Sequence, residues 1–281
     1  MSNEPFKVTT TAIMPQAKLN ETQIILQRHC NYDKQKGGLI PESIRIQKEV
    51  VNKFNEVMNN QSSNEELKNT YFLFVSSGTV SSSNFKRAKE TTNIAMSEVK
   101  KFFENNSISS SHILNLDLDK NYNSEVREDK HLTEPSMFTD SSGYFEYLKE
   151  KHGGINKDFW IDFEGDLSIE KRKEFDTEGP EEIVNRVIRY LNILKRYSDY
   201  FHKKNPNSRL IIWNGTHYDI LSPLVKQRIL NYNKEDIVKV DNCGGLSILI
   251  DEFSSITINM NGITYPFDLQ YNPQLYLHYR K

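Results

Sequence analysis

Short apolar runs and longer amphipathic stretches follow one another along the chain, and this pattern predicts alternating strands and helices. The runs TQIILQ, TYFLFVSS and RLIIWNG occupy residues 22–27, 70–77 and 209–215. Apolar runs of this length are typical of strands that are covered on both faces, as in a parallel sheet. We therefore expect these three runs to be strands of one buried sheet.

The stretches between these runs have the residue spacing of helices. Residues 41–60 (PESIRIQKEVVNKFNEVMNN) follow a loop that contains Gly37 and Gly38. From Phe85 onward, apolar residues recur at spacings of three and four and define one helical face. Residues 179–204 begin with Gly-Pro-Glu-Glu, in which proline suits the first helical position and the glutamates suit the positive end of the helix dipole. Each of these stretches is expected to be a helix.

The C-terminal part predicts a different strand arrangement. Residues 245–251 and 254–260 are two β-prone runs that are separated too briefly for a crossover helix, so they should pair antiparallel. Asn261-Gly262 should form the turn that ends the second run. The fold class that we expect is α/β, as a three-layer α/β/α sandwich whose central sheet is mostly parallel with an antiparallel edge.

Two segments lack this regular pattern. Residues 1–20 are polar and are expected to form an N-terminal arm, which leaves one domain over 21–281. Residues 105–178 mix Ser, Asn and acidic residues with a possible strand at 112–118, and we interpret them as an insertion. This insertion contains aromatic residues that could cover a pocket or pack locally, namely Phe138, Tyr144, Phe145, Tyr147, Phe159, Trp160 and Phe163.

Composition and charge narrow the function classes. A content of 37% hydrophobic and 26% charged residues suits a folded soluble protein, and a net charge of −2 gives no overall attraction to nucleic acid or to an anionic membrane. The N-terminus lacks the pattern of a signal peptide, and no apolar run approaches the roughly 20 residues of a membrane helix. Cys30 and Cys243 are too few for a disulfide framework and lack the paired spacing of a zinc site. We therefore expect a cytoplasmic protein.

Candidate catalytic residues follow the three predicted parallel strands. Such sheets bind ligands beyond the carboxyl ends of their strands, so the loops after residues 27, 77 and 215 should meet at one edge. These loops and the helix after the second strand supply Arg28, His29, Arg87 and His217. Arginine presents a planar fork of donors that suits phosphate oxygens, and a neutral histidine has a free ring nitrogen that can act as a nucleophile. The pattern indicates phosphoryl chemistry.

Three segments resemble motifs of the histidine phosphatase (phosphoglycerate mutase-like) superfamily. LQRHC (26–30) is similar to the Arg-His-Gly signature of that family, with Cys30 in place of the glycine. VSSGTVSSSNFKRAKETTNIA (75–95) resembles its Ser-Ser…Arg-Ala-x-Glu/Gln-Thr segment, and NGTHYDIL (214–221) resembles the segment that carries its second histidine. The motifs occur in the family's order within residues 22–260, each at a strand–helix junction.

The resemblance implies a phosphatase that needs no metal ion or other cofactor. His29 would become phosphohistidine, while Arg28, Arg87 and His217 would hold the phosphoryl oxygens. Gln35, in the segment NYDKQK after the Arg-His pair, is a further candidate for substrate binding. The substrate would be a phosphorylated small molecule or a phosphoprotein. Hydrolysis is favoured over mutase activity, because the family's mutase-type residues do not follow the Arg-His pair. The sequence does not indicate an oligomeric state.

The reaction also needs a carboxyl group that protonates the leaving oxygen and later activates water. Glu134, in HLTEP, matches the Leu-x-Glu position at which the family carries this acid. Asp219 is the competitor, because one branch of the superfamily places the acid directly after the second histidine, although Tyr218 intervenes here. Glu125 and Glu128 are further candidates.

Other functions fit part of the same pattern. A metal-dependent hydrolase could use as ligands His29, Asp33, His217 and Asp219. The two arginines disfavour this alternative, because they would repel a divalent cation. A catalytically weak protein of the same fold could bind a phospholigand or act as a scaffold. Cys30 could be a nucleophile paired with His29, but neighbouring residues on an extended strand point to opposite faces.

Overall fold

The structure is a computed structural model, and it describes residues 6–33, 35, 38–78, 86–114, 126–138, 143–165, 168–230 and 238–272. Its strands are β1 (Phe6–Val8), β2 (Thr22–Arg28), β3 (Thr70–Ser77), β4 (Ile113–Leu114), β5 (Arg127–Asp129), β6 (Arg209–Thr216), β7 (Val238–Val240), β8 (Gly245–Ile250), β9 (Ile256–Met260) and β10 (Ile263–Pro266). Its α-helices are α1 (Pro41–Gln61), α2 (Asn64–Lys68), α3 (Arg87–Asn105), α4 (Tyr144–His152), α5 (Lys157–Glu164), α6 (Ile169–Glu174), α7 (Pro180–Lys204) and α8 (Tyr218–Val225). Short helical turns are η1 (Thr10–Ala12), η2 (Ser110–His112), η3 (Lys130–Leu132), η4 (Ser136–Phe138) and η6 (Lys226–Leu230). None of the helices in the described ranges combines the length and the apolar character that crossing a bilayer requires.

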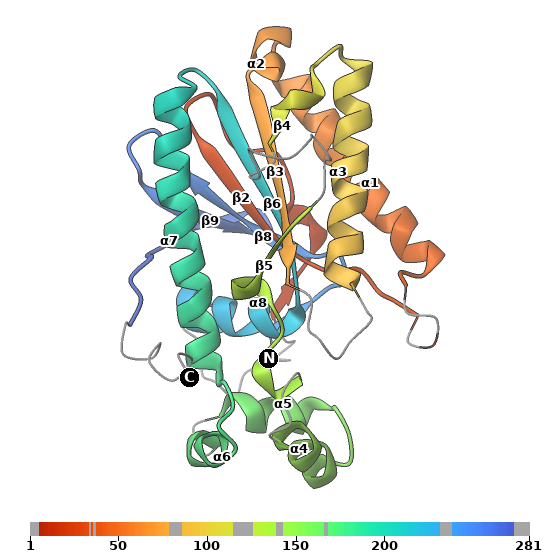
Figure 1. Ribbon diagram of the computed structural model, residues 1–281, viewed down its shortest axis with the longest axis vertical. Helices are drawn as coiled ribbons and strands as arrows, with labels where there is room; N and C mark the ends of the chain where they lie inside the picture. Colours follow the sequence, from red (N-terminus) through yellow and green to blue (C-terminus); the bar gives the residue numbers. More distant parts are fainter. Residues whose placement is uncertain are drawn as a thin grey trace.

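The central sheet has the strand order β10-β9-β8-β2-β6-β3-β4, and β5 also pairs with β3 (Figure 1). β2, β6 and β3 are parallel neighbours, and Asn214 of β6 lies between Leu26 of β2 and Val75 of β3. β8, β9 and β10 run antiparallel on the other side of β2. The predicted turn at Asn261-Gly262 joins β9 to β10, and both residues have the left-handed backbone that a two-residue hairpin turn requires, with φ of 55° and 81°. The parallel core and the antiparallel edge are both confirmed.

Helices cover both faces of this sheet. Along β2, the buried side chains alternate in direction, so that Ile25 packs in a cluster with Val51 of α1 and Phe103 of α3, whereas Leu26 packs in a cluster with Leu191 of α7. Figure 1 shows α1 and α3 on one side of the strands and α7 on the other. The predicted three-layer arrangement of helices, sheet and helices is confirmed.

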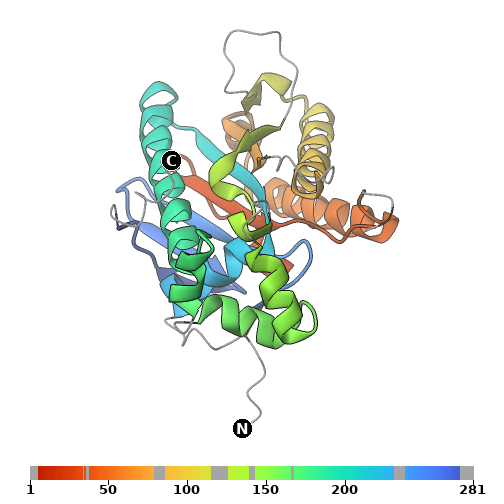
Figure 2. The ribbon, with the colours of Figure 1, turned by 60° about the horizontal axis from the view of Figure 1, so that its bottom comes forward.

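The insertion places helices beyond the sheet. Figures 1 and 2 show α4, α5 and α6 together beyond the carboxyl ends of β2, β3 and β6. The strand expected at 112–118 is present as β4 over Ile113–Leu114, and residues 115–118 lie outside the described residues. The helical part of the insertion therefore lies at the edge of the sheet where we expect the site.

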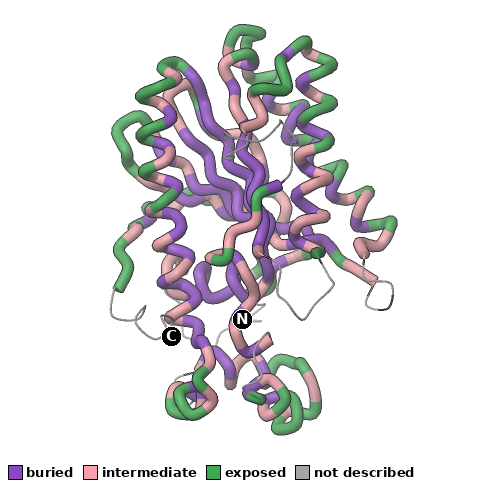
Figure 3. The backbone as a smooth tube through the Cα atoms, in the orientation of Figure 1, coloured by how far each residue is buried: buried purple, intermediate pink, exposed green. Residues whose placement is uncertain are grey.

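The N-terminal segment packs against the domain. β1 pairs in parallel with β7, and Ala12 and Ile13 are buried. The Ser247 hydroxyl of β8 donates a hydrogen bond of 2.7 Å to the carbonyl oxygen of Ala12. Figure 3 shows the buried interior that results, with the sheet strands buried over most of their length. Residues 6–20 are thus docked, a point that their polar sequence left open.

Candidate active site

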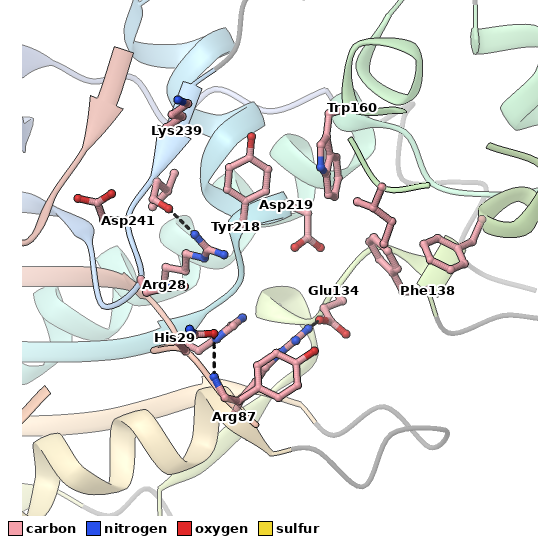
Figure 4. Close-up of a pocket in the computed structure, with 16 residues that line it drawn as sticks. Arg28, His29, Arg87, Glu134, Phe138, Trp160, Tyr218, Asp219, Lys239 and Asp241 are labelled. Carbon is pink, nitrogen blue, oxygen red and sulfur yellow. Dashed lines mark hydrogen bonds and ion pairs between the residues drawn. The ribbon is translucent and has the colours of Figure 1, made fainter. Parts of the chain in front are cut away.

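Four basic side chains meet at the carboxyl edge of the parallel strands, and Figure 4 shows three of them, Arg28, His29 and Arg87. Arg28 is the last residue of β2 and His29 follows it, Arg87 is the first residue of α3, and His217 directly precedes α8. The ring centroids of His29 and His217 are 5.2 Å apart. Both histidines are buried, with 5% and 6% of their surface exposed. The structure therefore brings together the four residues that the sequence placed at this edge.

Gly215 explains how α3 reaches the edge of the sheet. A Cβ atom at Gly215 would lie 2.8 Å from the carbonyl oxygen of Ala88 and would overlap the hydroxyl of Thr92. β6 and the first turn of α3 thus approach each other more closely than any side chain would allow. Because Arg87 directly precedes Ala88, this contact positions the Arg87 guanidinium beside the end of β6.

His29 is held as a neutral imidazole with one defined tautomer. Its Nδ1 lies 2.7 Å from the carbonyl oxygen of Cys30. Because a carbonyl oxygen only accepts, Nδ1 must carry the proton, and the lone pair is left on Nε2. Burial, followed by the neighbouring His217 and Arg87, lowers the pKa of His29 well below its usual value. Near neutral pH, Nε2 of His29 is therefore available as a nucleophile.

Each arginine of the site lies against a tyrosine ring. The guanidinium carbon of Arg28 is 5.4 Å from the ring centroid of Tyr218, and that of Arg87 is 4.6 Å from the ring centroid of Tyr32. Nη1 of Arg28 donates to the carbonyl oxygen of Val240, while its Nε is buried and has no hydrogen-bond partner among the described residues. Such a donor would gain a partner from a bound anion.

His217 lies between the Ser77 hydroxyl at the end of β3 and the carboxylate of Glu134. Its Nε2 lies 2.9 Å from the Ser77 hydroxyl, and its Nδ1 lies 3.2 Å from Oε1 of Glu134 without the geometry of a hydrogen bond. The same Glu134 oxygen pairs with Nη2 of Arg87. Burial lowers the pKa of His217 to about 3, so its ring is neutral at neutral pH. Ser77 belongs to the Ser-Ser part of the second motif, and it holds this ring in place.

The positions of the four carboxyl groups considered as proton donors show which of them reach the pocket. Glu134 and Asp219 both line the pocket. Burial raises the pKa of Asp219, and one of its oxygens has no hydrogen-bond partner among the described residues. Glu128 does not line the pocket and pairs with Lys89 at 2.7 Å. Glu125 lies outside the described residues. Glu134 and Asp219 are thus the two candidates that reach the site.

Arg186 of α7 fastens the loop that carries Glu134. Its Nε donates to Glu178 at 2.6 Å, and only 4% of the Glu178 side chain is exposed. Its terminal nitrogens donate at 3.1, 2.7 and 2.6 Å to three carbonyl oxygens that precede Glu134, those of Lys130, His131 and Thr133. No sequence signal distinguished Arg186 from the other polar residues of this helix. Tyr32, which covers Arg87, was missed for the same reason.

Cys30 is not a nucleophile here, because its sulfur is bonded to Cys243. This disulfide joins the residue after His29 to the residue that precedes Gly244, with the two Cα atoms 4.5 Å apart. Both cysteines are buried, and neither lines the pocket. The side chain in place of the family's glycine therefore points away from the candidate phosphate site. The interpretation of Cys30 as a catalytic thiol is wrong, and the cytoplasmic location expected from the low cysteine count stays a prediction.

Two further sequence-based assignments concern the loop after His29. Gln35 is exposed, its backbone N–H donates to Asp33 Oδ1 at 2.8 Å, and it does not line the pocket. Its role in substrate binding stays a prediction. Within the ranges that the structure describes, no three His, Cys, Asp or Glu side chains come together in a way that could hold a metal ion. The ligand set considered for a metal-dependent hydrolase is therefore not assembled, and Asp33 lies outside the pocket lining.

Arg28, His29 and Arg87 line a pocket of about 760 Å³, whereas His217 lies behind its lining. This volume is within the range of about 300–1,000 Å³ that is typical of small-molecule sites. The lining residues are Arg28, His29, Asn31, Tyr32, Arg87, Glu134, Phe138, Phe145, Ile155, Trp160, Tyr218, Asp219, Lys239, Val240, Asp241 and Asn242.

The similarity of this chain to known proteins is a similarity of fold to solved structures. No protein-family model and no curated protein matches the chain. A phosphoglycerate mutase from Bacillus anthracis str. Sterne has a TM-score of 0.45 and 14% identity, over 87% of this chain and 94% of that chain. A mycobacterial glucosyl-3-phosphoglycerate phosphatase has a TM-score of 0.44 and 14% identity, over 87% of this chain and 97% of that chain. A structure described as mycobacterial hydrolase 2 has a TM-score of 0.46 and 12% identity, over 92% of this chain and 96% of that chain. Similar solved structures thus include phosphoglycerate mutase-like proteins of the histidine phosphatase fold, and with TM-scores below 0.5 this likeness assigns no activity to the chain.

Proposed function

We propose that the protein is a phosphomonoester hydrolase that acts without a metal ion and forms a phosphohistidine on His29. The observation that carries the proposal is the state of the His29 ring, whose Nδ1 is bonded to a carbonyl oxygen while its Nε2 has no hydrogen-bond partner among the described residues. A neutral imidazole with a free nitrogen is the form that attacks phosphorus. Arg28 and Arg87 line the same pocket, and their guanidinium groups match the oxygens of a phosphoryl group.

The reaction would proceed in two displacements. In the first, Nε2 of His29 bonds to phosphorus as the bond to the ester oxygen breaks, and that oxygen takes a proton from a carboxyl group. In the second, the resulting carboxylate takes a proton from water, whose oxygen bonds to phosphorus as the bond to Nε2 breaks. Inorganic phosphate leaves, and His29 is again neutral. Arg28, Arg87 and His217 would stabilise the charge that spreads over the non-bridging oxygens.

We assign the proton transfer to Glu134. Its Oε1 contacts both Arg87 and His217, so it lies beside two of the groups that we place on the phosphoryl oxygens. Asp219 is the competing candidate, because burial raises its pKa and favours its protonated form. Glu134→Gln should lower kcat on an alkyl phosphate by about 10²–10⁴-fold. On p-nitrophenyl phosphate, whose leaving group departs without a proton, it should leave the rate of the first displacement, measured as the burst of p-nitrophenolate, nearly unchanged. If Asp219→Asn shows this difference and Glu134→Gln does not, the assignment moves to Asp219.

Phosphate release from a panel of monoesters tests the proposed function. We expect the EDTA-treated protein to release phosphate and His29→Ala to release none. Phe253→Ala is a matched control, because Phe253 is 80% exposed and does not line the pocket. Activity that EDTA removes and a divalent metal restores would indicate a metal-dependent hydrolase. Binding of phosphorylated ligands without release from any ester would indicate a phospholigand-binding or scaffold protein.

A further inference from the structure

The pocket extends from the basic side chains in two directions of different chemistry. Figure 4 shows Lys239 and Asp241 on one side of the pocket, and Phe138 and Trp160 on the other. The charged side belongs to β7 and the residues that follow it, whereas the aromatic side belongs to the insertion. The organic part of a bound ester therefore meets charges in one direction and rings in the other.

The aromatic side is formed by Phe138 of η4, Phe145 of α4 and Trp160 of α5, which we call the aromatic wall. All three side chains are partly exposed, and Ile155 beside them is 54% exposed. Among the described lining residues that the insertion supplies, Glu134 alone is ionisable. Lys149 Nζ lies 5.7 Å from the centroid of the Phe145 ring but does not line the pocket. Among the described lining residues, the aromatic wall thus presents apolar surface without a charged side chain of its own.

The rings of the aromatic wall are held by one another and by the core beneath them. The ring centroid of Phe138 lies 5.2 Å from that of Phe145 and 6.2 Å from that of Trp160. Trp160 also makes edge contacts at 5.2 Å with Phe159 and at 6.1 Å with Phe163, both of which are fully buried. Because the rings are fixed before a ligand arrives, little side-chain entropy is lost when a ligand packs on them.

The aromatic wall is continuous with the candidate phosphate site. The Trp160 ring lies 5.3 Å from the ring of Tyr218, which in turn lies against the Arg28 guanidinium. Figure 4 shows Glu134 and Asp219 between the wall and the basic side chains. One small molecule can therefore place its phosphoryl group at the arginines, its ester oxygen near the carboxyl groups and its organic group on the wall.

We propose that the substrate is a small phosphate monoester whose leaving group carries an uncharged aromatic ring, and that Phe138, Phe145 and Trp160 bind this ring. The proposal rests on the proposed function, because the same pocket must hold the phosphoryl group. Rings prefer offset or edge contacts with other rings, and the partly exposed wall offers such contacts. Burial of the additional apolar surface should tighten binding by on the order of 10-fold to 100-fold relative to a methyl group.

Binding of two phosphonates tests the wall without requiring turnover. Titration calorimetry on the full-length protein compares benzylphosphonate with methylphosphonate, which share the phosphoryl-like group and differ in the ring. We expect benzylphosphonate to bind at least about 10-fold more tightly. Equal affinities, or no binding of either compound, would overturn the proposal.

Two variants show whether the wall is the source of the preference. Trp160→Ala should remove most of the preference for benzylphosphonate over methylphosphonate. Ile155→Asp provides a second variant that should fold, because Ile155 is 54% exposed, and its added charge should also weaken benzylphosphonate binding. Phe253→Ala should change neither affinity. A preference that survives both Trp160→Ala and Ile155→Asp would contradict the assignment.

Hydrolysis separates the failure of this inference from the failure of the proposed function. Benzyl phosphate and ethyl phosphate release alcohols of similar basicity, so a difference in kcat/KM reports recognition of the ring. We expect kcat/KM to be at least about 10-fold higher for benzyl phosphate. Equal hydrolysis of both esters would overturn the inference and keep the phosphatase. Selective binding of benzylphosphonate without hydrolysis of either ester would overturn the phosphatase and keep the ring site. A phosphotyrosine peptide hydrolysed far better than free phosphotyrosine would overturn the assignment to a small molecule.

Discussion

Arg186→Lys is expected to disturb the loop that carries Glu134 without altering the lining of the pocket. The Arg186 guanidinium donates to Glu178 and to three backbone carbonyl oxygens at distances between 2.6 and 3.1 Å. A lysine has one nitrogen and no planar fork, so it cannot reach all of these acceptors at once. Lysine keeps the positive charge beside Glu178, so the buried carboxylate is not left unpaired.

The contacts of Arg186 indicate how far its substitution should lower the free energy of unfolding and kcat. Each hydrogen bond from a charged group contributes about 1.5–3 kcal/mol, so loss of at least one carbonyl contact should lower the free energy of unfolding by about that amount. Arg186→Ala should cost more, about 3–5 kcal/mol, because it leaves Glu178 buried without its partner. A displacement of a catalytic group by about 1 Å can lower the reaction rate by about 10²-fold. We therefore expect kcat of Arg186→Lys on benzyl phosphate to fall by about 10-fold to 100-fold.

The assay compares two esters that differ in their need for a proton. For Arg186→Lys, kcat should fall on benzyl phosphate, whereas the burst of p-nitrophenolate in the first turnover of p-nitrophenyl phosphate should keep nearly its wild-type rate. Arg196→Lys is the matched control, because Arg196 lies on the same helix and is exposed. A first-turnover burst that slows as much as kcat on benzyl phosphate would show that Arg186 only stabilises the fold, and an unchanged kcat on benzyl phosphate would show that Arg186 does not position Glu134.

Gly215→Ala should destabilise the protein by about 1–3 kcal/mol in urea unfolding, because its Cβ would lie 2.8 Å from the Ala88 carbonyl oxygen; unchanged stability would contradict the close packing of α3 on β6. Burial lowers the pKa of His217 to about 3 from a usual value of 6.5, so its contribution to stability is complete above pH 6.5 and is lost as the pH falls toward 3. Between pH 6.5 and pH 5 the loss should be about 2 kcal/mol, and His217→Asn should reduce this pH dependence, as unfolding at the two pH values would show. Reduction of the Cys30–Cys243 disulfide should lower the free energy of unfolding by about 2–4 kcal/mol and leave phosphatase activity measurable. A double serine variant is the control, because a reductant should not change its stability. If the reductant also leaves the stability of the wild type unchanged, the bond does not form.

The fold and the position of the site could be predicted because both follow from local patterns and general topology. Apolar runs with the length of strands alternate with helical periodicity, and parallel strands end at a common edge. Arg28, His29, Arg87 and His217 were therefore placed together before any contact was known. The choice between Glu134 and Asp219 could not be made, because it depends on distances between elements that the sequence does not define.

The features that the sequence did not reveal depend on contacts between distant residues. Cys30 and Cys243 are 213 positions apart, so nothing in their local sequence indicates that they meet. Arg186 reaches carbonyl oxygens 53 to 56 positions away. The sequence also did not show which aromatic residues of the insertion line the pocket and which are buried in the core. Those that line the pocket are Phe138, Phe145 and Trp160. Those that are buried are Tyr144, Phe159 and Phe163.

A chemical quench of the working protein tests the proposed nucleophile most directly. The protein is mixed with a monoester that it hydrolyses, quenched in alkali within the first turnover, digested, and analysed by mass spectrometry for a phosphorylated peptide. We predict one acid-labile phosphoryl group on His29, absent from His29→Ala and accumulating in Glu134→Gln with p-nitrophenyl phosphate, where its hydrolysis is slowed. Hydrolysis without any phosphorylated intermediate, or a phosphoryl group on another residue in the wild type, would contradict the central claim.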